Sequence, residues 1–141
     1  MSNSFTLNNG IEIPCPAFGT YKAVDGNKET IKLAIEAGYR CFDTASYYGT
    51  EEYLAEAIAE SGIARSAFFI ISKLWKTEMG YDKTMAAFEA SLKRLNTDYI
   101  DLYMIHWPLP EVGYKDWKVL DFDTWNTSRI VAMSFCEPRS C

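Results

Sequence analysis

Short apolar segments alternate with amphipathic segments along most of this 141-residue chain, and this alternation strongly constrains its fold. Four apolar segments are expected to be strands, at residues 17–21, 41–45, 68–73 and 99–107. Three helices are expected between them, at residues 27–37, 50–61 and 81–95. Strands that are apolar on both faces and alternate with helices are typical of βαβ units, so the sequence predicts a parallel sheet.

The expected helices carry start and stop signals. Asn27 and Thr50 are residue types that cap a helix through a side-chain oxygen. Glu51 and Glu52 suit the positive end of the second helix, and Gly62 is expected to end it. The third helix has an apolar stripe at near-heptad spacing, formed by Met85, Phe88, Leu92 and Leu95.

The first residues of the chain predict a β-hairpin. A loop at residues 8–10, with Gly10 in the left-handed conformation, is expected to join two short strands. The apolar pairs are then Leu7 with Ile11 and Phe5 with Ile13, all on one face. Pro14 and Pro16 are expected to end the hairpin.

Composition excludes several classes of protein. The net charge of −5 and pI near 4.9 argue against binding to nucleic acid or a membrane surface, which needs clustered lysine and arginine. No apolar run approaches the ~20 residues of a membrane span, and the first residues lack the pattern of a signal peptide. The four cysteines show no C-x-x-C spacing, which predicts a reduced, cytoplasmic setting.

Polar residues stand at the carboxyl ends of the expected strands. They are Gly19 and Thr20, then Asp43, then Lys73, then His106, the single histidine of the chain. Parallel strands bring these ends to one edge of the sheet, which in a (β/α)₈ barrel is the edge that holds the active site. We therefore expect the three ionisable side chains to converge there.

Tyr48 follows Asp43 by five residues and is a candidate proton donor. A free tyrosine titrates near ~10, which is too weak an acid for ready proton donation at neutral pH. A neighbouring ammonium stabilises the phenolate, and Lys73 can supply that ammonium, held in place by Asp43. The set suits proton delivery to a carbonyl oxygen while a hydride arrives from elsewhere.

Each residue also has a structural explanation. A strand-end aspartate often caps a turn, a strand-end lysine is often solvated, and a lone histidine is often a buried structural residue. The aromatic residues Tyr21, Trp75 and Trp107 could wall an apolar substrate pocket or pack at the edge of the sheet. No metal-binding spacing supports a site built on Asp43 and His106, and neither a P-loop nor a Rossmann motif occurs.

Several stretches closely resemble signatures of the aldo-keto reductase family. Residues 38–51, GYRCFDTASYYGTE, look like the first signature of that family. Residues 72–75, SKLW, and 101–108, DLYMIHWP, look like its next two landmarks. The opening hairpin and residues 18–21, FGTY, match as well, so the resemblance covers about residues 5–125.

The resemblance implies an α/β fold of the (β/α)₈ TIM-barrel type and NADPH-dependent reduction of aldehydes or ketones to alcohols. The catalytic tetrad of the family falls on Asp43, Tyr48, Lys73 and His106. The cofactor-binding positions near the nicotinamide ribose fall on Gly19, Thr20 and Asp43. The substrate-binding positions fall on Tyr21, Trp75, His106 and Trp107. The stretch around Tyr21 resembles microbial reductases of small aldehydes, glyoxals and diketo sugars.

The end of the chain departs from the family pattern. A (β/α)₈ barrel needs roughly 250 residues, and four strands are expected here. Residues 123–125 look like the start of a fourth helix, whereas residues 126–141 do not continue it. We expect residues 1–125 to be the N-terminal half of a barrel and residues 126–141 to be an atypical tail, read out of frame or spliced differently.

Two classes of function follow from these expectations. The first is an NADPH-dependent reductase of small carbonyl compounds, favoured by retention of all four tetrad residues. The second is a non-catalytic half-barrel that self-associates or binds a partner, favoured by the short length. Because barrel phosphate sites usually follow strands seven and eight, NADPH binding by the isolated chain is expected to be weak or absent, with self-association.

Overall fold

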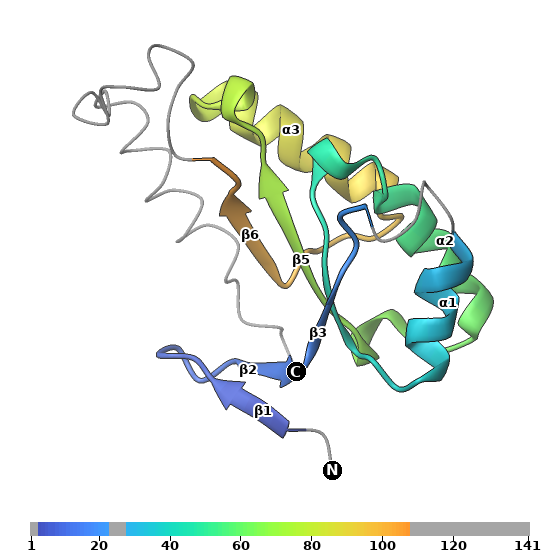
Figure 1. The fold of residues 1–141 in the computed structure, drawn as a ribbon. Helices are drawn as coiled ribbons and strands as arrows, with labels where there is room; N and C mark the ends of the chain where they lie inside the picture. The colour runs from blue at the N-terminus through green and yellow to red at the C-terminus, as the bar shows by residue number, and fades with distance from the viewer. Residues whose placement is uncertain (1–2, 23–27, 108–141) are drawn as a thin grey trace.

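The computed structural model describes residues 3–22 and 28–107 of the chain. Four strands in it form one parallel sheet in the order β3-β4-β5-β6, which confirms the predicted sheet (Figure 1). These strands are β3 Ala17–Gly19, β4 Cys41–Asp43, β5 Phe69–Leu74 and β6 Leu102–Ile105. The predicted cap Asn27, the fourth helix and the tail at residues 126–141 lie outside the described residues.

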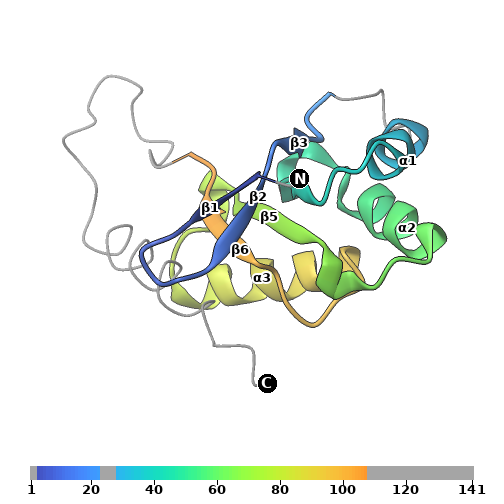
Figure 2. The ribbon, with the colours of Figure 1, turned by 90° about the horizontal axis from the view of Figure 1, so that it is seen from below.

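Three helices connect the strands and cover one side of the sheet (Figures 1 and 2). They are α1 Lys28–Glu36, α2 Glu51–Ser61 and α3 Tyr81–Arg94. Short 3₁₀ turns lie in the connections, namely η1 Ser46–Tyr48, η2 Arg65–Ala67 and η3 Lys76–Glu78. The order strand, helix, strand repeats along the described chain, which is the βαβ arrangement that parallel pairing requires.

The main core lies between the helices and the sheet. Its large members include Ile31, Ile35, Phe42, Leu54, Ile70 and Tyr103, each at most 3% exposed. Burying one large apolar side chain stabilises the fold by roughly 1.5–3 kcal/mol. This layer fixes the strands and helix ends that carry the polar residues of the sheet edge.

A smaller apolar cluster lies on the other face of the sheet. Cys41, Phe69 and Ile71 form its buried part, and Ile11 and Ile13 of the hairpin pack against it. Successive side chains of a strand point to opposite faces. Two residues beyond Cys41 and Ile71, the strands therefore place Asp43 and Lys73 on this same face.

The predicted hairpin is present, formed by β1 Asn3–Thr6 and β2 Glu12–Cys15. Phe5 pairs with Ile13, the Leu7 amide donates to the Ile11 carbonyl at 2.8 Å, and Gly10 has a φ of +83°. Pro14 lies inside β2, so the prediction that it ends the hairpin is wrong. An edge strand tolerates a proline because one side of its backbone needs no ladder partner.

The hairpin lies at the amino ends of the parallel strands (Figure 1). Viewed from that end, β1 and β2 stand in front of the sheet (Figure 2). The packing of Ile11 and Ile13 against the second cluster agrees with both views. The hairpin therefore closes the end of the sheet opposite to Asp43, Lys73 and His106.

Two helix predictions need correction. Thr50 makes no side-chain cap to α2, because its hydroxyl is bonded to Thr20 and Thr44 instead. The buried stripe of α3 is formed by Thr84, Ala87 and Ser91, with Leu95 just past the helix end. Phe88 and Leu92 of the predicted stripe flank the core and are partly buried. Small residues face the sheet, so the helix packs closely against it.

Two features are absent from the described ranges. None of the helices there has the length and apolar character needed to cross a membrane. The same ranges hold no group of three or more His, Cys, Asp or Glu side chains able to bind a metal ion.

Candidate active site

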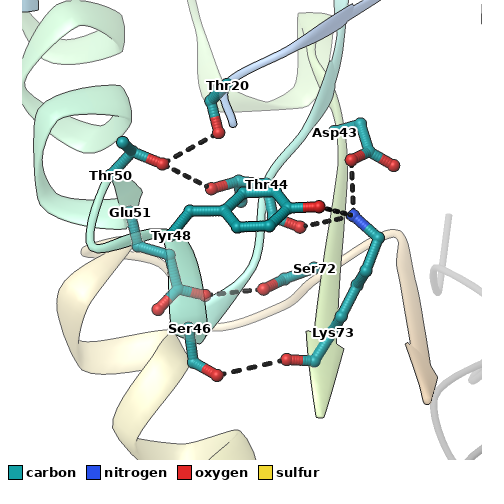
Figure 3. A network of polar contacts seen from close by, with 9 residues as sticks. All are labelled: Thr20, Asp43, Thr44, Ser46, Tyr48, Thr50, Glu51, Ser72 and Lys73. Atoms are coloured by element: carbon teal, nitrogen blue, oxygen red, sulfur yellow. Dashed lines mark hydrogen bonds and ion pairs between the residues drawn. The ribbon is translucent and has the colours of Figure 1, made fainter. Parts of the chain in front are cut away.

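The ammonium of Lys73 connects three groups at the carboxyl edge of the sheet (Figure 3). It forms an ion pair with Asp43 Oδ1, donates to the Thr44 carbonyl at 2.9 Å, and lies 3.5 Å from Tyr48 Oη. An ammonium has three N–H donors, and these three acceptors use them all. The structure thus brings the predicted Asp43, Tyr48 and Lys73 together.

The Lys73 side chain is more deeply buried than its partner Asp43. The Lys73 side chain is 11% exposed, whereas that of Asp43 is 32% exposed. Burying an ammonium is costly unless it is paired and hydrogen-bonded, and the Asp43 carboxylate provides that compensation. A fixed ammonium so close to a phenol oxygen can stabilise negative charge on that oxygen.

His106 lies beside Tyr48 and follows β6. Its amide donates to the Leu74 carbonyl at 2.9 Å, which extends the β5–β6 pairing to the edge of the sheet. The ring centroids of His106 and Tyr48 are 5.2 Å apart in a T-shaped contact, and those of His106 and Trp75 are also 5.2 Å apart. Tyr47 makes a third T-shaped contact with centroids 6.0 Å apart, so His106 is held among three aromatic rings.

The charge state of His106 follows from its surroundings. Partial burial lowers the pKa of the imidazole below its usual 6.5, the Lys73 ammonium lowers it further, and Asp43 partly opposes them. His106 is therefore mainly neutral at pH 7 and has one donor and one acceptor nitrogen. Its Nδ1 is buried without a hydrogen-bond partner among the described residues.

Aromatic side chains surround this polar group. The Tyr21 ring lies 4.8 Å from that of Tyr48, and Trp75 contacts His106. Tyr47, which the sequence reasoning did not select, stacks on Trp75 with centroids 3.9 Å apart and an interplanar angle of 11°. Trp107 is 38% exposed at the same end of β6. Trp75 is thus one member of a stacked aromatic pair at this edge of the sheet.

Gly19 and Thr20 stand at the end of β3, beside Asp43. Gly19 pairs with Asp43 in register, and an added Cβ there would meet nothing within 4 Å. The Thr20 amide donates to the Asp43 carbonyl at 2.9 Å. Its hydroxyl is fully buried and lies 2.8 Å from that of Thr50. Gly19 therefore leaves open space beside the partly exposed Asp43 carboxylate.

A buried polar network behind the site was not expected from the sequence. The Glu51 carboxylate accepts from Ser72 Oγ and from Arg94 Nε, both at 2.6 Å (Figure 3 shows the Ser72 bond). Glu51 was expected to interact only with the positive end of α2. Its position three residues after Tyr48 gave no signal of these contacts, because the partners come from β5 and α3.

Comparison with known proteins identifies the family. Residues 17–127 match the sequence profile described as "Aldo/keto reductase family". The chain is 47% identical over 124 residues to a glyoxal reductase of Bacillus subtilis, covering 86% of this chain and 45% of that protein. It is 46% identical over 110 residues to an aldehyde reductase of Saccharomyces cerevisiae, covering 77% and 35%. The chain belongs to the aldo/keto reductase family.

Solved structures agree with this assignment. An aldo/keto reductase from Brucella melitensis superimposes with a TM-score of 0.79 at 39% identity, covering 96% of this chain and 51% of that one. A Bombyx mori aldo-keto reductase in complex with NADP gives 0.76 at 33% identity, covering 95% and 48%. The chain therefore corresponds to part of an α/β barrel, and it spans less than half the length of the curated relatives named above.

Proposed function

We propose that this chain carries the proton-donating site of an NADPH-dependent reductase of aldehydes or ketones. One observation carries the proposal: the Lys73 ammonium is bonded to the Asp43 carboxylate and lies 3.5 Å from the Tyr48 hydroxyl. A buried, fixed positive charge next to a phenol is the arrangement that a tyrosine needs to act as an acid.

Each residue has a distinct role in the proposal. Tyr48 donates its proton to the carbonyl oxygen of the substrate as that oxygen becomes an alkoxide. Lys73 stabilises the resulting phenolate, and Asp43 holds Lys73 in place. The neutral His106 donates a hydrogen bond that orients the carbonyl, because its ring is fixed beside Tyr48.

The residues at the end of β3 fit the cofactor proposal. Gly19 leaves open space next to Asp43, and the Asp43 side chain is partly exposed, so the pair can receive a ribose hydroxyl. Thr20 is fully buried and bonded to Asp43 and Thr50, so it would act indirectly, by holding the end of β3 in place beside Asp43. NADPH, when bound, supplies the hydride that the carbonyl carbon accepts.

The substrate proposal is a small carbonyl compound in an aromatic pocket. Tyr21, Trp75 and Trp107 would contact it, with the Tyr47–Trp75 stack as one wall. The names of the relatives, glyoxal reductase and aldehyde reductase, favour small aldehydes and glyoxals as the first substrates to test.

The test is NADPH oxidation with methylglyoxal or 4-nitrobenzaldehyde. Tyr48→Phe removes one hydroxyl and is expected to lower turnover on the order of 10²- to 10⁴-fold. Tyr47→Phe is the matched control, because it removes the neighbouring hydroxyl and keeps the stack on Trp75. Equal turnover in the chain and in Tyr48→Phe would contradict the proposal.

A second candidate function is a non-catalytic half-barrel that self-associates. The observation in its favour is that β3 and β6 each pair with a single neighbour in the described sheet. Unpaired strand edges promote association between chains. In this proposal residues 1–125 act as the barrel half and residues 126–141 as a separate tail. Sedimentation velocity, combined with the NADPH-oxidation assay, tests this candidate. A monomer that turns over substrate contradicts it, whereas inactive oligomers support it.

A further inference from the structure

The carboxylate of Glu51 is buried although it lies in the first turn of a helix. Glu51 is 1% exposed, whereas its neighbour Glu52 is exposed. A carboxylate that interacts only with the helix dipole can remain in water, as Glu52 does. Burying a charge carries a desolvation cost, and a buried ion pair adds little net stability over apolar packing. The position of Glu51 therefore calls for another explanation.

The two oxygens of Glu51 bind two different elements. Oε1 accepts from Ser72 Oγ of β5, and Oε2 accepts from Arg94 Nε of α3, each at 2.6 Å. Arg94 in turn donates to Ser91 Oγ at 3.0 Å. Short, charge-assisted bonds are directional, so they hold the start of α2 at one position against the sheet.

Ser72 directly precedes Lys73 in β5, and Tyr48 lies three residues before Glu51 (Figure 3). The loop that carries Tyr48 is also bonded to β5 at its other end. The Thr44 amide donates to the Ile71 carbonyl at 2.8 Å. The Tyr48 loop is thus fixed to the strand of Lys73 on both sides.

We propose that Glu51 is a positioning residue, which bonds Ser72 and Arg94 and thereby sets the separation between the Tyr48 hydroxyl and the Lys73 ammonium. The catalytic meaning of this role rests on the proposed function, but the geometry can be tested by itself. Displacing a catalytic group by about 1 Å lowers a rate on the order of 10²-fold, so such a device matters for a proton donor.

The test uses the ring resonances of His106, the only histidine of the chain. The Tyr48 ring lies against that of His106, so its ring current contributes to the His106 chemical shift. Spectra are recorded at about pH 8.5, where the imidazole is neutral in every variant. Tyr48→Ala gives the reference position for a displaced ring.

The variants separate positioning from general stability. Glu51→Ala is expected to move the His106 resonances at least half of the way toward the Tyr48→Ala position. Ser72→Ala, which removes one partner of Glu51 but leaves Arg94 unchanged, is expected to move them in the same direction by less. Glu51→Gln can accept from Arg94 through its carbonyl oxygen and donate to Ser72 Oγ through its amide nitrogen, so it is expected to restore the wild-type position. The exposed control Glu52→Ala is expected to leave that position unchanged.

These outcomes distinguish a positioning role of Glu51 from a purely structural one without any measurement of turnover. Lower thermal stability in Glu51→Ala and Ser72→Ala with unchanged His106 resonances would overturn the positioning role and leave a structural one. If turnover proves independent of Tyr48, the proposed function is wrong, but the spectral comparison still tests whether Glu51 positions Tyr48. Where turnover is measurable, Glu51→Ala is expected to lower kcat on the order of 10²-fold with little change in KM for the carbonyl compound.

Discussion

The Tyr48 hydroxyl lies 3.5 Å from the Lys73 ammonium, although the two residues are 25 positions apart in sequence. The ammonium is held there by Asp43 and by the Thr44 carbonyl. In the proposed function, the lysine is therefore in place before substrate binds, and its charge would need no rearrangement as Tyr48 loses a proton.

Replacing Asp43 by asparagine is expected to weaken the site without disrupting the fold. The neutral amide would keep one acceptor oxygen for Lys73 but lose the negative charge, and hydrogen bonds to charged groups are worth about 1.5–3 kcal/mol. Because about 1.4 kcal/mol is tenfold, kcat/KM is expected to fall roughly 10- to 100-fold. Steady-state NADPH oxidation measures this, with the exposed Asp82→Asn as control. An unchanged rate in Asp43→Asn would remove Asp43 from the mechanism.

The titration of His106 is expected to have its midpoint below 6.5. Burial and the Lys73 ammonium both lower the pKa of the imidazole. Lys73→Met removes one of these causes and should raise the midpoint, whereas Lys83→Met, on the exposed side of α3, should not. NMR detects the single histidine directly. A midpoint at or above 6.5 in the unmodified chain contradicts the described packing.

The same shift predicts a pH dependence of stability. The unfolded chain takes up a proton on His106 near pH 6.5, whereas the folded chain does so at lower pH. The free energy of unfolding is therefore expected to fall as pH drops from 6.5 toward the folded pKa. Urea unfolding across this range measures it, and His106→Gln should flatten that part of the curve.

The contacts of Glu60 predict a loss of stability in a second, more acidic pH range. Side-chain hydrogen bonds from Lys28 and Lys32 lower the pKa of Glu60 from 4.5 to about 2. Its contribution to stability is therefore complete above 4.5 and is lost as pH falls toward 2. Since these side chains are exposed, the effect should shrink in high salt. Glu60→Gln should remove it, whereas Glu89→Gln on α3 should not. A low-salt stability curve between pH 4.5 and 2 that is the same in Glu60→Gln would contradict the contacts.

The core prediction concerns Phe42, which is 0% exposed on the helix side of β4. Phe42→Ala is expected to destabilise the fold by about 3–5 kcal/mol, because a buried cavity replaces the ring. Leu33→Ala is the control, since Leu33 is 57% exposed on α1. Chemical unfolding followed by circular dichroism compares the two. A loss below about 1 kcal/mol for Phe42→Ala would contradict the described core.

Much of this fold could be predicted from local sequence signals. The period of the apolar residues indicated the strands and helices, and the residues at strand ends placed Asp43, Lys73 and His106 at one edge, because parallel strands share a direction. Gly10 and the apolar pairs predicted the hairpin register. These features depend on neighbours in sequence or on simple sheet geometry.

Other features depend on partners that are distant in sequence. Thr50 has the chemistry of a helix cap, yet its hydroxyl bonds Thr20 and Thr44. Glu51 resembles an ordinary first-turn acid until β5 and α3 supply its donors. Tyr47 stacks on the Trp75 ring, which follows a different strand. Composition and periodicity carry no information about such contacts.

The most direct test is a double-mutant cycle on Tyr48 and Lys73. Rates of methylglyoxal reduction are compared for the chain, Tyr48→Phe, Lys73→Met and the double variant. If Lys73 acts through Tyr48, the double variant is expected to be no slower than Tyr48→Phe alone, so the two effects are strongly non-additive. Additive losses would show that the lysine and tyrosine act independently, and would contradict proton donation by an ammonium-supported tyrosine.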